Sequence, residues 1–354
     1  MMRHQRLESL TGLRGIAALA VVLFHAVLAF APDSPLVHAT RALPVAVSFF
    51  FILSGFVLTW SWNDHRRLNV FWRDRAARIL PIYLLSWLIA VAALSWLRWT
   101  PTQTEMLASL FLVQAWVPNE HFPIAVNVPS WSLSCEVAFY AALPFVAVRV
   151  RGASSQTRAR LARWCAAGIL AGGGLALIFP LKYWPPTRAP EFLAGVLLAV
   201  AMQRGWRAGP RTLIAGCLST ASIVVLSASS APLPQPAATM VAVPAFVALI
   251  AFVAARDLVG LQTGLSSLPL RTLGAWSYSL YLTHWVVVVV ISRYLVGAAW
   301  IPVGIVASLA VAAAACLGVE RPARRRLRGS RQSRGATYRP QVASASEPTG
   351  GSVT

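Results

Sequence analysis

Residues 10–31, LTGLRGIAALAVVLFHAVLAFA, form the apolar stretch that decides how the rest of the chain is interpreted. About twenty consecutive apolar residues are enough to cross the hydrocarbon core of a bilayer as a helix. Two ionisable side chains, Arg14 and His25, lie within this stretch. Because an ionisable residue inside a transmembrane segment is costly and is usually retained for function, the stretch predicts both a membrane span and a site.

Apolar stretches of similar length recur along almost the whole chain of 354 residues. Hydrophobic residues make up 57% of the sequence and charged residues only 12%, and the mean hydropathy is +0.63. A soluble domain is far less apolar and carries about twice this share of charge. The chain is therefore predicted to be an all-α, polytopic integral membrane protein.

Ten stretches predict membrane-spanning helices: Leu10–Ala31, Pro44–Trp62, Ile79–Leu97, Trp131–Val148, Leu161–Pro180, Pro190–Gln203, Thr212–Ser230, Ala237–Ala255, Leu273–Leu295 and Ile301–Gly318. A further apolar stretch, Met106–Val117, is too short for an ordinary span and is flanked by Pro101 and Pro118. We interpret it as a re-entrant or interfacial segment.

Basic residues predict the orientation. With ten spans, all but five of the 31 Lys and Arg residues lie on the side of the N-terminus, and the exceptions are Arg41, Arg98, Lys182, Arg188 and Arg293. The positive-inside rule then predicts that both termini lie in the cytoplasm. The expected location is a bacterial-type cytoplasmic membrane. Because the basic residues are scattered between apolar spans, they predict membrane anchors and no nucleic-acid partner, despite the net charge of +20.

The two ends of the chain and its four cysteines allow three further predictions. The basic start imitates a cleavable signal peptide, but the long apolar run and Pro32 favour a retained signal-anchor helix. Residues 1–320 are predicted to form one membrane domain, and the basic tail 321–354 is predicted to be disordered. Four cysteines, Cys135, Cys165, Cys217 and Cys316, have no CxxC spacing, so neither a metal site nor a disulfide framework is expected.

Helix geometry predicts which polar residues share a helix face and which lie at a similar depth in the membrane. Arg14 and His25 are separated by roughly 16 Å along one helix face. Glu136 lies about 7 to 8 Å below the outer edge of a span that runs the opposite way, at a depth similar to that of His25. A carboxylate at that depth costs about 2.5–3.5 kcal/mol, so a partner is expected. We predict that His25 and Glu136 meet, with the carboxylate orienting the imidazole.

Six short motifs, in order along the chain, resemble those of the acyltransferase 3 family of integral membrane acyltransferases. They are residues 10–15 (LTGLRG) with Phe24-His25, 48–56 (SFFFILSGF), 75–83 (RAARILPIY), 131–140 (WSLSCEVAFY), 190–195 (PEFLAG) and 273–285 (LGAWSYSLYLTHW). Two positions depart from the pattern, because many members carry Asp at the position of Thr11 and a second Glu at the position of Val137. The latter departure leaves Glu136 without an acidic neighbour.

The resemblance implies transfer of an acyl group, usually acetyl, from cytoplasmic acyl-CoA to a hydroxyl group. The implied acceptor is a glycan or lipid-linked glycan, such as a cell-surface polysaccharide or exopolysaccharide. Acyl-CoA would be a donor substrate, with no permanently bound cofactor. Arg75 and Arg78 share one helix face at the level of Arg14, so all three are candidates to bind the CoA phosphates.

For the chemistry, we hypothesise that His25 is either the base that removes the acceptor proton or a transient acyl carrier. Glu136 would orient it. His284, inside the span Leu273–Leu295, is the third catalytic candidate and could bind the acceptor, shuttle a proton or bridge helices. Ser54, Trp131, Ser134 and Tyr278 are interpreted as packing or cavity-lining residues, and Glu191 as a helix-start acid outside the site.

Other functions stay open from the sequence. The acceptor could be a small, macrolide-like natural product, and a separate periplasmic or extracellular partner could receive a relayed acyl group. A secondary transporter or flippase also has about ten spans with a few buried ionisable residues, although no internal repeat is visible. An intramembrane serine protease is disfavoured, because Ser54-Gly55 lacks the preceding glycine of such a motif.

Overall fold

The computed structural model describes residues 7–62, 67–228, 234–261 and 263–328, and these residues form helices and loops without strands. The helices are α1 (Glu8–Phe30), α2 (Leu36–Thr40), α3 (Ala46–Trp60), α4 (Leu68–Trp96), α5 (Gln103–Leu110), α6 (Trp131–Gly152), α7 (Ser155–Ile178), α8 (Pro185–Gln203), α9 (Pro210–Ala228), α10 (Gln235–Leu258), α11 (Leu268–Ser292), α12 (Ile301–Ala315) and α13 (Arg321–Arg328). A π-helix, Cys316–Glu320, joins α12 to α13. The all-α prediction is confirmed.

Each of the ten predicted spans has a helix at its position. Among the described residues, eight helical segments are long and apolar enough to cross a membrane, which makes the chain a polytopic membrane protein. The eight exclude α8 and α9, with 19 residues each. The count of ten spans therefore stays a prediction. The stretch around Met106–Val117 contains α5, whose eight residues rise only about 12 Å.

Four helices, α4, α7, α8 and α11, begin five or more residues earlier than hydropathy indicates. The helix α4 starts at Leu68 and not at Ile79, so Arg75 and Arg78 lie on a helix that extends beyond the apolar core. Arginine is a good helix former, and charge alone does not end a helix. The helix α8 starts at Pro185, five residues before Pro190, because proline is well tolerated in the first turn.

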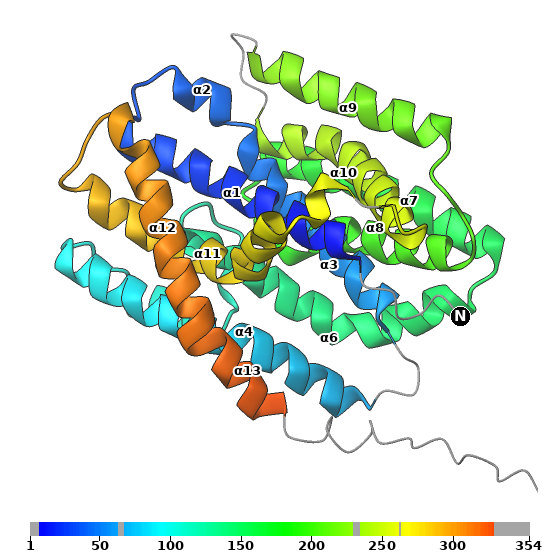
Figure 1. Ribbon diagram of the computed structural model, residues 1–354, viewed down its shortest axis with the longest axis horizontal. Coiled ribbons are helices and arrows are strands. Elements are labelled where there is room, and N and C mark those ends of the chain that lie inside the picture. Colours follow the sequence, from blue (N-terminus) through cyan, green and yellow to red (C-terminus); the bar gives the residue numbers. More distant parts are fainter. Residues whose placement is uncertain (1–6, 63–66, 229–233, 262, 329–354) are drawn as a thin grey trace, which may run out of the picture.

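The C-terminal part also differs from the prediction. The tail predicted to be disordered from residue 321 is helical from Arg321 to Arg328, where α13 packs beside the start of α4. Residues 329–354 lie outside the described residues. Figure 1 shows α12 and α13 as one long element along the edge of the bundle.

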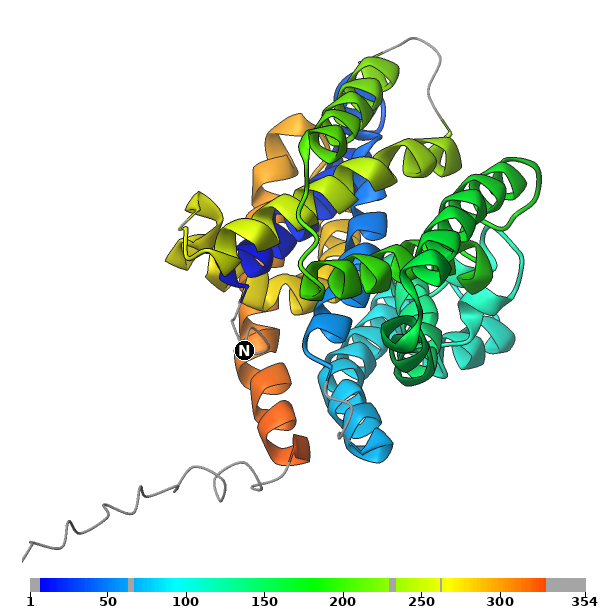
Figure 2. The same ribbon diagram turned by 90° about the vertical axis from the view of Figure 1, so that its right-hand side faces the viewer.

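The helix α1 runs through the middle of the bundle and packs most extensively against α11 (Figure 1). The second extensive contact joins α3 and α8, while α9 lies at the periphery and contacts mainly α10 (Figures 1 and 2). The helices α1, α4 and α11 begin at the same end of the bundle, and α3, α6 and α8 finish there. We call it the arginine-rich end, because Arg14, Arg75, Arg151 and Arg271 lie toward it.

Candidate active site

Glycines let the two central helices approach closely. A Cβ atom added to Gly274 of α11 would lie 1.9 Å from the carbonyl oxygen of Thr11, and one added to Gly15 of α1 would lie 2.7 Å from the nitrogen of Gly274. Small residues at helix contacts allow backbones to approach in this way. The helices are therefore parallel neighbours, with positions about 260 residues apart at similar heights.

This contact brings the two intramembrane histidines together. His25 Nδ1 lies 2.9 Å from His284 Nε2, and the ring centroids are 5.1 Å apart. His284 is fully buried and His25 is 9% exposed. The ring of Trp285 packs edge-on against His25 at a centroid distance of 5.1 Å. The structure thus places His284 against His25.

The hydrogen bonds of the pair assign its protons. His284 Nδ1 lies 3.0 Å from the carbonyl oxygen of Leu280, which can only accept, so Nδ1 carries the hydrogen. In a neutral ring, His284 Nε2 then accepts a hydrogen bond from His25 Nδ1. The lone pair of His25 is consequently on Nε2. The backbone of α11 therefore leaves His25 with a basic nitrogen that points away from its partner.

Glu136 has a different partner from the one predicted. Its Oε2 accepts a hydrogen bond of 2.8 Å from the Tyr140 hydroxyl, which lies 3.1 Å from the hydroxyl of Ser54. Within the described part of the chain, His25 and Glu136 form no hydrogen bond with each other. The predicted pairing of His25 with Glu136 is therefore corrected to two separate pairs.

His25 and Glu136 do not pair because they lie at different depths along the bundle. Ser132, near the start of α6, is 3.0 Å from the hydroxyl of Tyr281 on α11, so these two residues lie at one level. Glu136 is four residues from Ser132 toward the arginine-rich end, and His284 is three residues from Tyr281 the other way. With a rise of 1.5 Å per residue, roughly 10 Å along the helix axes separates the carboxylate from the histidine pair.

A large cavity extends from the arginine-rich end, past Glu136, as far as Tyr281. Its volume is about 690 Å³, and its wall combines residues of α1, α3, α4, α6 and α11. Arg14, Arg75 and Arg78 line it together with Glu136, so the structure brings four of the six predicted site residues to one cavity. His25 and His284 lie beyond Tyr281, which is also in the wall.

The arginines in the wall are held in different ways. Arg14 donates from Nε to the Ser277 hydroxyl at 2.8 Å and from Nη2 to the carbonyl oxygen of Gly274 at 2.6 Å. These bonds fix its guanidinium against α11. Arg75 and Arg78 line the wall from α4, one helical turn apart. Arg271 and Arg321 also line the cavity, so five arginines give it a basic wall that suits an anionic ligand.

The sequence did not predict a buried carboxylate at the end of the π-helix that follows α12. Glu320 is 2% exposed, accepts a hydrogen bond of 2.8 Å from Ser279 and pairs with Arg324 at 3.3 Å. The next residue, Arg321, lines the large cavity. The only sequence signal is a single glutamate at the end of an apolar run, and π-helices such as Cys316–Glu320 often lie near functional sites.

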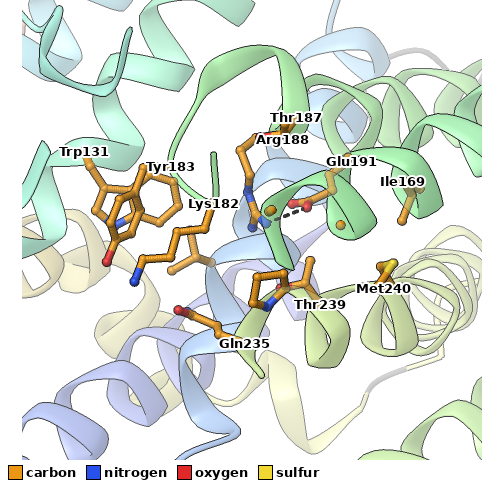
Figure 3. Close-up of a pocket in the computed structure, with 15 residues that line it drawn as sticks. Trp131, Ile169, Lys182, Tyr183, Thr187, Arg188, Glu191, Gln235, Thr239 and Met240 are labelled. Carbon is orange, nitrogen blue, oxygen red and sulfur yellow. Dashed lines mark ion pairs between the residues drawn. The ribbon is translucent and has the colours of Figure 1, made fainter. Parts of the chain in front are cut away.

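A second buried ion pair lies near the opposite end of the bundle. Arg188 and Glu191 are 3.0 Å apart, Arg188 also donates to Ser48 at 2.9 Å, and its guanidinium packs over the rings of Phe51 and Trp131. Figure 3 shows this pair beside a small cavity that Lys182 and Gln235 also line. Glu191 was interpreted as a helix-start acid, but its partner makes it part of the packing between α3 and α8.

Across the ranges that the structure describes, no group of three or more His, Cys, Asp or Glu side chains could hold a metal ion. Cys135, Cys165, Cys217 and Cys316 are not joined to one another.

Known proteins resemble the chain along nearly its whole length. A family model described as an acyltransferase domain matches residues 7–319. Acyltransferase MdmB of Streptomyces mycarofaciens is 37% identical over 81% of this chain and 80% of its own. Exopolysaccharide production protein ExoZ of Rhizobium meliloti is 40% identical over 27% of this chain and 31% of its own. Peptidoglycan O-acetyltransferase OatA of Listeria monocytogenes is 25% identical over 79% of this chain and 49% of its own. No solved structure matches the chain significantly.

Proposed function

The chain belongs to this acyltransferase family, and from that premise we propose that it moves an acyl group, most simply acetyl, from acyl-CoA to a hydroxyl group of a glycan. The observation that carries the proposal is the arrangement along the bundle: a cavity of about 690 Å³ lined by Arg14, Arg75 and Arg78 leads toward the His25–His284 pair. Two relatives whose names refer to exopolysaccharide and peptidoglycan support a glycan acceptor.

The donor is assigned to the arginine-rich end. CoA carries several phosphates, which arginines bind through charge-assisted, bidentate hydrogen bonds. The excess of basic residues at this end supports a cytoplasmic location, where acyl-CoA is available. From Arg14, the axis of α1 rises roughly 16 Å to His25, a length comparable with an extended pantetheine arm. The nucleotide would stay near the arginines while the thioester extends toward the histidines.

At the histidines, the acceptor hydroxyl would donate its proton to His25 Nε2. The acceptor oxygen bonds to the acyl carbon, the carbon–sulfur bond breaks, and His25 returns the proton to the departing CoA sulfur. His284 holds the His25 ring in the required tautomer through its own bond to Leu280. The same Nε2 would attack the thioester directly if His25 acts as an acyl carrier.

Glu136 takes a different role in this proposal from the one predicted. The carboxylate, the Tyr140 hydroxyl and the Ser54 hydroxyl form a polar strip on the wall of an otherwise apolar cavity. Amide groups of the pantetheine arm are suitable donors to a carboxylate. We therefore place Glu136 with the donor and not with the base.

The proposal is tested with membranes that contain the chain or its His25→Ala variant, supplied with acetyl-CoA labelled in the acetyl group. Label should move to glycan only with the unchanged chain, and surface-glycan analysis of a deletion strain should show loss of an O-acyl ester. If the glycan is unchanged but a secreted small molecule loses its acyl group, the acceptor class is wrong. If labelled donor is not consumed at all, the enzyme proposal fails. Quenched samples in which label stays on the protein would identify His25 as a carrier.

Replacing Arg78 with alanine is expected to raise the KM for acyl-CoA by about 10- to 150-fold, the factor for one hydrogen bond to a charged group. The turnover number should change much less, because Arg78 lies far from the histidine pair. Steady-state kinetics with varied donor checks this, and Arg78→Lys should be intermediate, because lysine keeps the charge but loses the bidentate geometry.

Arg73→Ala is the matched control for this prediction. Arg73 lies on the same helix, has a side chain 52% exposed and is not in the cavity wall. An Arg73 variant that weakens donor binding as much as the Arg78 variant would show that only general surface charge matters.

A further inference from the structure

The large cavity stops short of the residues to which we assign the chemistry. Its wall reaches Phe50, Ser132 and Tyr281, but His25 and His284 are not among the described residues that line it. A donor bound as proposed above would therefore meet the ring of Tyr281 before it meets the histidines. The position of this ring determines whether the thioester and the base can come into contact.

The ring of Tyr281 lies between the large cavity and the histidine pair, and it contacts Phe50 of the cavity wall as well as His284. Its ring centroid is 6.1 Å from that of His284 and 5.7 Å from that of Phe50, and the residue is 7% exposed. Because Tyr281 precedes His284 by three residues, both side chains lie on the same face of α11. The ring covers the histidine pair from the cavity side.

One hydrogen bond holds this ring in place. The Ser132 hydroxyl is 3.1 Å from the carbonyl oxygen of Pro129, to which it donates its only hydrogen. Ser132 Oγ must therefore accept the hydrogen of the Tyr281 hydroxyl, 3.0 Å away. A single neutral hydrogen bond is weak enough to break during turnover.

Ser132 lies in the first turn of α6, directly after a loop that also contacts α11. Ser132 follows the 3-10 turn Val128–Ser130, and the nearby Asn127 donates to the carbonyl oxygen of Leu282 at 3.0 Å. The loop and the first turn of α6 thus contact α11 at two adjacent residues, Leu282 and Tyr281. An acceptor that shifts this loop would also shift the partner of Tyr281.

We propose that Tyr281 is a gate between the donor cavity and the histidine pair, held closed by its hydrogen bond to Ser132. The proposal rests on the acyl-transfer function above. With the gate closed, the thioester is kept from His25. With the gate open and no acceptor present, water takes the place of the acceptor: its oxygen bonds to the acyl carbon, the carbon–sulfur bond breaks, and the products are the free carboxylic acid and CoA thiol.

The test measures hydrolysis of acetyl-CoA by the full-length protein in the absence of acceptor. Tyr281→Phe keeps the ring but removes the bond, and it should raise hydrolysis about fivefold, the factor for one neutral hydrogen bond. Ser132→Ala should have the same effect, and the double variant should be no faster than either single variant, because one bond is lost in each. Adding His25→Gln to Tyr281→Phe should abolish the increase.

Tyr83→Phe is the matched control. Tyr83, on α4, is buried and donates to the carbonyl oxygen of Ser109, but it does not line the cavity, so this variant also loses one neutral hydrogen bond of a buried tyrosine. Hydrolysis in this variant should equal that of the unchanged chain. A Tyr281→Phe protein that transfers acyl groups normally without faster hydrolysis would overturn the gate. An unchanged chain that neither transfers nor hydrolyses would instead overturn the proposed function.

Discussion

Replacing His25 with glutamine is expected to reduce acyl transfer by about 10²- to 10⁴-fold, the usual contribution of a positioned general base. Glutamine can still donate a hydrogen bond to His284 Nε2, so the contact between α1 and α11 is retained. It has no basic nitrogen where His25 Nε2 lies. Initial rates with saturating acetyl-CoA and acceptor measure the loss.

Two further variants sharpen this prediction. His284→Gln should lose less activity than His25→Gln, because the base remains and only its orientation is relaxed. His38→Gln should behave like the unchanged chain, because His38 is exposed on the short helix α2. A His25→Gln protein that keeps more than a tenth of the activity would remove His25 from the chemistry.

Replacing Gly274 with alanine is expected to destabilise the fold by about 1–3 kcal/mol, the cost of inserting a methyl group into a well-packed contact. The added Cβ would lie 1.9 Å from a backbone oxygen of α1, which cannot rotate away as a side chain can. The two helices must therefore separate. That movement would also disturb the Arg14 contact with α11 and the His25–His284 distance, so activity should fall together with stability.

Gly174→Ala is the control for packing. A Cβ at Gly174, inside α7, would meet nothing within 4 Å, so only helix propensity changes, by up to about 1 kcal/mol in favour of alanine. Thermal unfolding of both proteins in one detergent compares them directly. Equal melting temperatures would show that α1 and α11 are not held by this close approach.

The helices were largely predictable from the sequence, because hydropathy reports directly whether a segment prefers lipid. The start of α4 was not, since the arginines before Ile79 resemble a loop by charge, whereas the backbone is already helical from Leu68. The start of α8 was missed for a related reason. Pro190 was interpreted as the first residue of a span, although a further turn precedes it.

The candidate site was predictable as a set of residues but not as a set of pairs. His25, His284, Glu136 and the arginines each stand out because ionisable groups are rare in apolar segments. Which of them meet depends on which helices are neighbours and at what height, and hydropathy carries no such information. The glycines of α1 and α11 were the available signal, because small residues mark helices that approach closely.

Tyr281, Ser132 and Glu320 show what pattern reasoning overlooks. A tyrosine in an apolar run is ordinary, and its importance follows only from the rings and the hydroxyl that surround it. Glu320 was passed over because it stands where the last span was expected to have ended.

The neighbouring position of α1 and α11 also sets the order in which the protein can be made. His25 is synthesised early, but its partner His284 emerges some 260 residues later, after nine other helices. Ser9, at the start of α1, likewise pairs with a residue that is synthesised 248 residues later. The Asp257 carboxylate accepts hydrogen bonds from the backbone nitrogen and the hydroxyl of Ser9. All the helices through α11 must therefore be synthesised before the site exists. A nascent chain that stalls before α11 would have no histidine pair and could not carry out the proposed acyl transfer.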